Sequence, residues 1–192
     1  LKKLIEREIK KDYRFNNYKY FHSVFEINQW SEKNDFCLEN LCKRTNNCLN
    51  SSLELQSTIE LYSGRYHEFV NDFLRDKTHF DEVPKFINET IYNLDYILKN
   101  SKTSENLIVV RRFDVFFFND KLKRNEIFID KGYLSSSLNL LYRLDIEGNY
   151  REIENEVFLI LKVPRGVNAI YIERTSRRSE YELLINRNQK IK

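Results

Sequence analysis

Apolar residues in the first part of the chain recur every three or four positions, which is the spacing of an amphipathic helix. Leu1, Leu4, Ile5 and Ile9 follow this spacing, and residues 18–30 continue in the same style. The pattern predicts helices in this N-terminal part.

Three further helices are predicted before the middle of the chain. Residues 51–64 open with serines suited to capping and close at Gly64, a good helix stop. Residues 65–76 gather apolar side chains on one side. Residues 83–100 place Pro84 near their start, where proline is tolerated, ahead of a long apolar stripe.

The second half of the chain changes its period. Short runs rich in β-branched and aromatic residues alternate with turn residues, which predicts strands. Helices followed by strands are typical of an α+β domain with segregated layers. The runs are residues 106–118, 126–138, 156–166, 168–173 and 180–187.

Composition bounds the class of protein. With 192 residues, 41% of them hydrophobic and 32% charged, the chain reads as one globular domain with a core of its own. A net charge of +3 is too weak to indicate a nucleic-acid partner. No stretch approaches the roughly 20 apolar residues that cross a bilayer, so no membrane partner is expected.

Both ends of the sequence fit a piece of a longer protein. The chain begins at Leu1 without methionine, which fits a processed or excised fragment, so a missing signal peptide excludes little. It stops at Lys192, where we expect a last strand to begin.

The three cysteines, Cys37, Cys42 and Cys48, lie in a polar segment over residues 33–50. An odd count excludes a complete disulfide framework within the chain. The spacing lacks the paired C-x-x-C ligands of a zinc site, so no metal is expected. Free thiols in a reducing compartment are favoured, and one disulfide with a spare thiol is the alternative.

Arg111 and Arg112 end an apolar strand. An arginine at such a place is costly to bury unless it meets an anion. The alternative is an arginine that simply leaves the sheet for solvent.

Three serines follow in a predicted strand. Ser135 and Ser137 would share one face, and Ser136 would take the other. Their hydroxyls could position a carboxylate or bind a sugar. An exposed edge or turn is the alternative.

Glu180 and Glu182 stand one residue apart before an apolar run. In a strand they would set two carboxylates side by side on one face. Like charges so close are unfavourable unless something offsets them. The alternative is an exposed strand edge whose charges resist edge-to-edge pairing.

The order of these motifs resembles the Arg-Ser-Glu class of mono-ADP-ribosyltransferases, above all bacterial toxins related to the catalytic domains of actin-modifying binary toxins. Residues 109–112 look like their aromatic-Arg-Arg motif with valine replacing the aromatic residue, residues 133–137 like their Ser-Thr-Ser motif, and residues 179–188 like their Glu-x-Glu strand. Trp30 is similar to a tryptophan of their upstream helices. A fourth match is their Tyr-Thr-Gly helix, here Tyr62, Gly64, Tyr66, Asn71, Leu74 and Arg75.

This resemblance implies an α+β ADP-ribosyltransferase fold. N-terminal helices would be followed by two packed, mostly antiparallel β-sheets around an NAD cleft. We expect a single catalytic domain over residues 1–192, with a helical N-terminal extension over 1–50 and an NAD-binding core over 51–192.

The resemblance also implies the chemistry. NAD would be a co-substrate split at its nicotinamide–ribose bond, through an oxocarbenium-like state that a carboxylate stabilises. Glu182 would stabilise this oxocarbenium-like state and bind the ribose 2′-hydroxyl. Glu180 would orient or deprotonate the acceptor, and a glutamate here goes with an arginine acceptor, whose pKa exceeds about 12.

Further residues are expected to hold NAD. Ser135 would brace Glu182 and touch the ribose, Arg111 would bind the phosphates, and the backbone of Arg112 would hold the nicotinamide amide. No Gly-rich dinucleotide fingerprint is present, which disfavours a Rossmann site. The other candidates are Asn71 and Arg75 for phosphate and ribose, Tyr62 and Tyr66 for the adenine side or as core aromatics, and Arg143 or, by preference, Arg151 for phosphate.

The expected partner is a target protein with an acceptor arginine. Arg177 and Arg178 replace an aromatic residue of the family's substrate-recognition turn, which argues against actin, indicates an acidic surface on the target, and makes these arginines candidate automodification sites. The setting implied is a secreted or injected toxin or effector, or a phage protein, acting in the target-cell cytosol. His22, His67 and His79 look incidental.

Three alternatives stay open at this point. Water could be the true acceptor in an NAD glycohydrolase that depletes NAD. An inactive relative could act as a binding module. A guanine base in nucleic acid is disfavoured, because the chain lacks a basic patch interleaved with aromatics.

Overall fold

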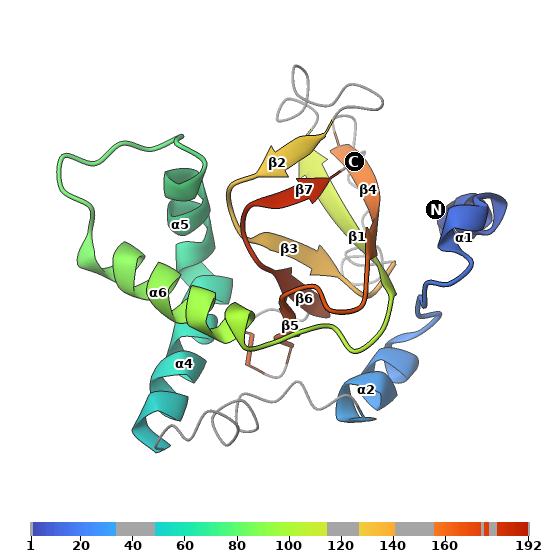
Figure 1. Cartoon of the computed structure of the whole chain (residues 1–192), viewed down its shortest axis with the longest axis horizontal. Coiled ribbons are helices and arrows are strands. Elements are labelled where there is room, and N and C mark those ends of the chain that lie inside the picture. Colours follow the sequence, from blue (N-terminus) through green and yellow to red (C-terminus); the bar gives the residue numbers. More distant parts are fainter. Residues whose placement is uncertain are drawn as a thin grey trace, which may run out of the picture.

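The computed structural model of the chain shows helices packed around a central set of strands (Figure 1). The prediction of an α+β fold with helices first and antiparallel strands later is confirmed. The structure describes residues 2–33, 49–114, 127–140, 156–173, 175–176 and 180–191.

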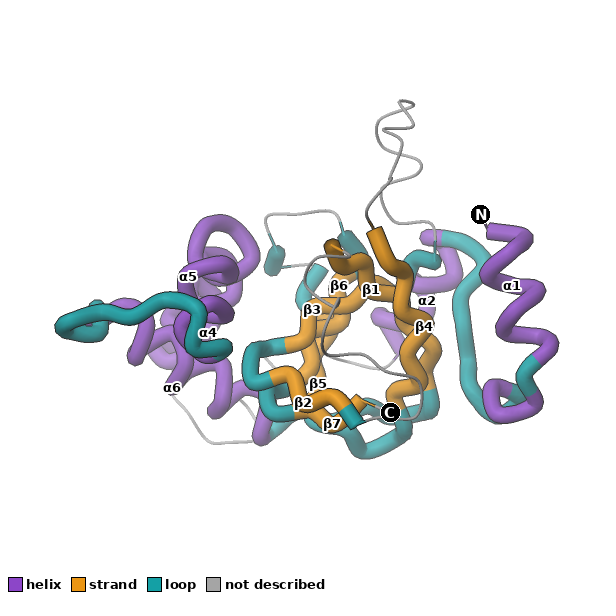
Figure 2. Tube along the Cα trace, turned by 90° about the horizontal axis from the view of Figure 1, so that it is seen from above, coloured by secondary structure: helices purple, strands orange, loops and turns teal. Residues whose placement is uncertain are grey.

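Two groups of helices flank the strands from opposite sides, as the view from above shows (Figure 2). One group holds α1 (Lys2–Lys11), the 3-10 turn η1 (Tyr13–Phe15) and α2 (Val24–Lys33). The other holds α4 (Leu49–Leu61), the π-helical turn η2 (Tyr62–Tyr66), α5 (His67–Leu74) and α6 (Lys85–Lys99). Among the described helices, none combines the length and the apolar character needed to cross a bilayer.

The helix predicted over residues 18–30 begins later, at Val24. Ser23 and Glu26 explain this start, because the Ser23 hydroxyl accepts from the Glu26 amide at 3.3 Å, as an N-cap does. The preceding segment is extended instead, and Lys19 forms a parallel bridge with Leu107. The backbone of this extended segment forms hydrogen bonds with amide and carbonyl groups at the start of the strand that contains Leu107. Without this pairing, those backbone groups would lack partners.

Gly64 does not end a helix, so that prediction is wrong. The chain runs from α4 through η2 into α5. A π-helical turn absorbs one extra residue without breaking the helix, and such turns are frequent at functional sites. The whole Tyr62–Tyr66 stretch of the predicted NAD-binding helix lies in this turn.

Two antiparallel sheets follow. A five-stranded sheet has the order β4-β1-β3-β6-β5, and β2 pairs with β7 in a second sheet. The sequence predicts that a last strand begins at Lys192, and β7 begins earlier, at Gln189. The strands are β1 (Leu107–Asp114), β2 (Phe128–Asp130), β3 (Leu134–Ser137), β4 (Glu156–Val163), β5 (Ala169–Tyr171), β6 (Glu182–Ile185) and β7 (Gln189–Ile191).

The five-stranded sheet is apolar on both faces. On one face Leu183 and Ile185 pack in a cluster with Trp30, whose ring meets Tyr171 edge-on at 6.0 Å. On the other face Leu184 packs against α4 and α6 in a second cluster. Fully burying one such leucine contributes about 1.5–3 kcal/mol, so the alternation along β6 fixes which face each neighbouring side chain takes.

Candidate active site

Glu182 begins β6 and is buried, with 4% of its surface exposed. In the register of β3 with β6, Ser135 lies opposite Leu184 and Ser137 opposite Glu182. Residues paired across an antiparallel ladder share a face, so Ser135, Ser137 and Glu182 lie on the same side of the sheet. A carboxylate buried at a strand end is costly unless it meets positive charge or hydrogen-bond donors.

The turn before Glu182 differs from the prediction. The strand starts at Glu182, and Tyr181 has a φ of +52°, in the left-handed region. The prediction that Glu180 and Glu182 lie two residues apart in one strand is therefore wrong, because the left-handed residue breaks the extended backbone between them. Glu180 is held in the turn, where its carbonyl oxygen accepts from the Ser137 hydroxyl at 2.7 Å.

Arg111 reaches from β1 toward β3. The two strands share a single registered pair, Val110 with Ser137, and the Nη1 of Arg111 donates to the carbonyl oxygen of Ser135 at 2.5 Å. The guanidinium thus donates to a β3 carbonyl oxygen, as a backbone amide of a neighbouring strand does in a regular sheet. Burial lowers the pKa of Arg111 to about 10, so the side chain is cationic at neutral pH and its charge is poorly hydrated.

This position of Arg111 excludes the alternative in which the arginine simply leaves the sheet for solvent. A desolvated cation is suited to binding an anion, because charge-assisted hydrogen bonds are strong. Its neighbour Arg112 lies over the ring of Phe158, with Cζ 5.3 Å from the ring centroid, in a cation–π contact.

Arg75 ends the helix α5 and forms a buried ion pair. Its Nε and Nη2 donate to the two carboxylate oxygens of Asp130 at 2.8 and 3.0 Å. The Asp130 carboxylate also accepts from the Gly132 amide at 2.9 Å. Two nitrogens of Arg75 are therefore committed to a protein partner that the sequence did not indicate.

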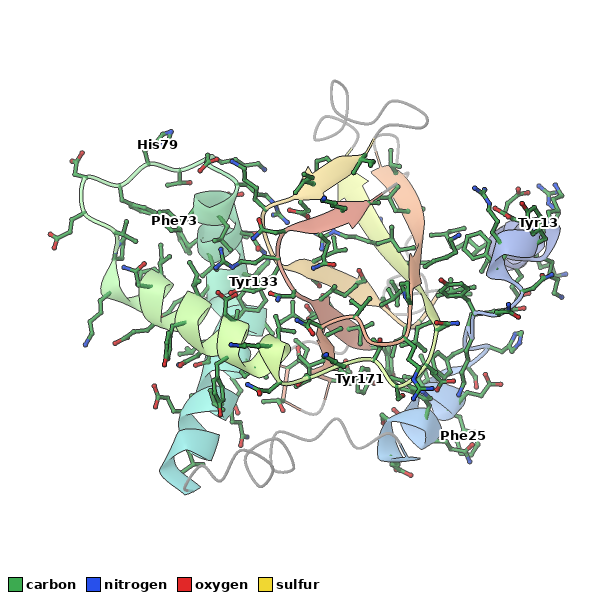
Figure 3. All side chains as sticks on the ribbon, in the orientation of Figure 1. Tyr13, Phe25, Phe73, His79, Tyr133 and Tyr171 are labelled. Carbon is green, nitrogen blue, oxygen red and sulfur yellow. The ribbon has the colours of Figure 1, made fainter. Side chains whose placement is uncertain are left out.

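Asn71 is likewise engaged within the protein. Its Nδ2 donates to the Tyr62 hydroxyl at 2.9 Å, and its Oδ1 accepts from the Tyr133 amide at 2.8 Å. Gly132 approaches so closely that a Cβ there would lie 2.7 Å from Asn71 Oδ1. Tyr133 lies between the helices α5 and α6 and the sheet (Figure 3).

The two predicted tyrosines differ in exposure. Tyr62 is 1% exposed and meets the Tyr133 ring edge-on at 5.8 Å, so the structure favours the core-aromatic alternative for it. Burial raises its pKa, and the charge of Glu182 adds to the rise. Tyr66 is half-buried, with its ring centroid 4.6 Å from that of Phe86.

Arg111 and the charged and polar residues around it form one electrostatic cluster, although they come from separate segments of the chain. The charge of Arg111 acts on Asp130, Arg75, Tyr62 and Glu182. The contacts of Asn71, Arg75 and the tyrosines with NAD stay predictions. The remaining predicted residues, Arg143, Arg151, Arg177, Arg178, Cys37, Cys42 and Cys48, lie outside the described part.

Two acidic residues at the site were missed by the sequence analysis. Asp130 holds Arg75, and Glu173 accepts from the Tyr181 amide at 2.6 Å. Neither lies in a recognisable motif, and each meets its partner only in the folded chain. No cluster of three or more His, Cys, Asp or Glu side chains fit to hold a metal ion occurs among the described residues.

The comparisons with known proteins identify the family. A family model described as ADP-ribosyltransferase exoenzyme matches residues 26–192, and the chain belongs to this family. The suspected class of bacterial ADP-ribosylating toxins is thereby confirmed. A search of curated proteins gave no match.

Solved structures of bacterial ADP-ribosylating toxins share the fold. C3stau2 from S. aureus, solved with NAD, is 16% identical, with a TM-score of 0.67 and coverage of 91% of this chain and 88% of that one. The C3 exoenzyme of Clostridium limosum is 18% identical, with a TM-score of 0.66 and coverage of 90% and 86%. The toxin BECa of C. perfringens, solved with NADH, is 20% identical, with a TM-score of 0.63 and coverage of 91% and 43%.

Proposed function

We propose that this chain transfers a single ADP-ribose from NAD to an arginine side chain of a target protein and releases nicotinamide. The observation that carries the proposal is the buried Glu182 carboxylate at the start of β6, with Glu180 in the adjoining turn and the Arg111 cation in the same electrostatic cluster.

Arg111 is suited to the diphosphate of NAD. The guanidinium is half-buried, its hydration is partly lost, and an anion would offset that cost. Ser135 lies on the face of Glu182 and would brace this carboxylate at the ribose. The backbone of Arg112 follows Arg111 along β1 and would hold the nicotinamide amide.

Glu182 would stabilise the reacting sugar. The bond between C1′ of the ribose and the nicotinamide nitrogen breaks, and its electron pair leaves with neutral nicotinamide. Positive charge develops on the sugar, and a fixed carboxylate stabilises that charge more in the transition state than in the ground state.

Glu180 would orient and deprotonate the acceptor. A guanidinium nitrogen of the target arginine forms the new bond to C1′, and the proton it loses passes to the Glu180 carboxylate and on to solvent. An arginine needs such a partner because its pKa lies above about 12. As a toxin or effector acting inside a target cell, the protein would meet cytosolic targets with an acidic surface.

The test measures nicotinamide release from NAD with and without agmatine, a small guanidinium acceptor. We expect agmatine to stimulate release by the wild-type chain. Glu182→Gln should lower release by about a hundredfold or more under both conditions. Glu180→Gln should retain slow release and lose the stimulation.

Glu68→Gln is the matched control, because this glutamate lies on α5 with 78% of its side chain exposed. It should behave like the wild type. Release that agmatine does not change would instead indicate the glycohydrolase, and a folded chain that releases nothing would indicate the binding module.

A further inference from the structure

The carboxylate of Glu173 lies inside the turn formed by Glu180, Tyr181 and Glu182. Its Oε2 accepts from the Tyr181 amide at 2.6 Å. Burial raises the pKa of Glu173, while hydrogen bonds from the backbone amides of Tyr181, Glu180 and Glu182 lower it. The hydrogen bond from the Tyr181 amide therefore places the Glu173 carboxylate against the backbone of this turn, where the neighbouring amides also stabilise its charge.

The conformation of Tyr181 explains why these amides point the same way. A left-handed residue within a turn brings successive N–H groups onto one side and makes a concave anion site. The φ of +52° costs a non-glycine residue about 1–2 kcal/mol. Something must offset that cost, and a carboxylate seated in the concave site does so by accepting hydrogen bonds from the amides of the turn.

The carbonyl groups of the same three residues are fixed by other segments. Glu180 O accepts from the Ser137 hydroxyl at 2.7 Å. Tyr181 O accepts from the Leu138 amide, and Glu182 O from the Ile172 amide, each at 3.0 Å. The backbone that carries both predicted catalytic carboxylates is thus held on its donor side by Glu173 and on its acceptor side by β3 and the end of β5.

We propose that Glu173 is a positioning residue for the transfer reaction: its carboxylate fixes the Glu180–Tyr181–Glu182 turn and so the distance between the carboxylate that serves the acceptor and the one that serves the sugar. This proposal rests on the proposed function. Glu180 depends most on Glu173, because it lies outside β6, whereas Glu182 is also held by the β3–β6 ladder.

Removing the Glu173 carboxylate should therefore change the partition of NAD between transfer and hydrolysis. In Glu173→Ala we expect agmatine-dependent release to fall on the order of tenfold to a hundredfold, since small misplacements of a reacting group have effects of this size. Release to water should fall less, and the KM for NAD should change little, because Arg111 lies on another strand. Glu173→Gln retains an oxygen acceptor and should recover part of the transfer.

A merely structural role would lower the melting temperature without changing the partition. Ile9→Val is the control for lost stability, because Ile9 is buried in α1 against a different cluster. It should lower the melting temperature and leave the ratio of transfer to hydrolysis as in the wild type.

The outcomes separate this proposal from the proposed function. If the wild type shows no agmatine-stimulated release, the proposed function fails. If the wild type transfers and both Glu173 variants keep its ratio of transfer to hydrolysis, the positioning role of Glu173 is overturned.

Discussion

Ser136 and Ser137 are neighbours in β3, but their hydroxyls meet opposite surroundings. The Ser137 hydroxyl donates to Glu180 O and accepts from the Asn139 amide at 3.0 Å. Ser136 faces the other side, where its buried oxygen has no hydrogen-bond partner among the described residues. The alternation predicted from the sequence is correct, and the structure adds what each face contains.

The two serines should respond differently to replacement by alanine. Ser137→Ala removes the hydrogen bonds that its hydroxyl makes with the Glu180 carbonyl and the Asn139 amide, so it should lower the free energy of unfolding by about 1–3 kcal/mol. Ser136→Ala removes a buried hydroxyl that satisfies no group and should leave stability unchanged or raise it. Urea denaturation measures both, and a larger loss for Ser136→Ala would contradict this account.

At the scale of elements, one ion pair joins the end of α5 to β2. The side chains of Arg75 and Asp130 are 13% and 0% exposed. Lys131 and Asp76 form a second pair nearby, just beyond the ends of the same two elements, with side chains 57% and 65% exposed. The two pairs therefore differ chiefly in burial.

Asp130→Asn should cost about 3–5 kcal/mol of folding free energy, because it removes the charged carboxylate to which two nitrogens of the buried Arg75 guanidinium donate. Asp76→Asn is the matched control and should cost no more than about 1 kcal/mol, as for an exposed pair. Thermal and urea unfolding of both variants test this. Equal losses would show that burial does not decide the strength of these pairs.

Element types could be predicted from local pattern, and connections could not. The β-branched runs gave β1 and β4, and the apolar stripe after Pro84 gave α6. The aromatic spacing of residues 18–23 predicts a helix, but backbone pairing with β1 overrides that spacing. Gly64 is typical of a helix end, and the residue pattern around it does not distinguish a helix end from a π-helical turn.

The candidate site shows the same division. The order of the motifs predicts Arg111, Ser135, Glu180 and Glu182 as candidate catalytic residues. Such residues can be predicted from motifs because the chemistry of a reaction requires particular residue types. The residues that hold the candidate site in place belong to no motif that the sequence reveals. Arg75 meets Asp130 across 55 residues of sequence, and Glu173 reaches Tyr181 across a turn whose left-handed backbone is unusual for tyrosine.

At the scale of the whole molecule, the partly desolvated charge of Arg111 links ligand binding to stability. Its pKa is about 10 in the folded chain, below the ordinary value of an arginine. The folded chain thus holds this proton less tightly than the unfolded chain, so the group disfavours folding below about pH 10, and this penalty fades as the pH rises above about 10. A bound diphosphate would favour the cation and remove much of the penalty.

NAD should therefore raise the melting temperature most where Arg111 is charged. In a Glu182→Gln chain, which spares the ligand, NAD at a hundred times its Kd should add about 2.7 kcal/mol, or roughly 5–10 °C for a domain of this size. Scanning fluorimetry should show this shift near neutral pH and a smaller one as the pH rises through about 10, because deprotonated Arg111 no longer attracts the phosphates. Arg111→Gln in the same background should show little shift at either pH. A shift that keeps its size across this range, or that survives in Arg111→Gln, would place the phosphates elsewhere.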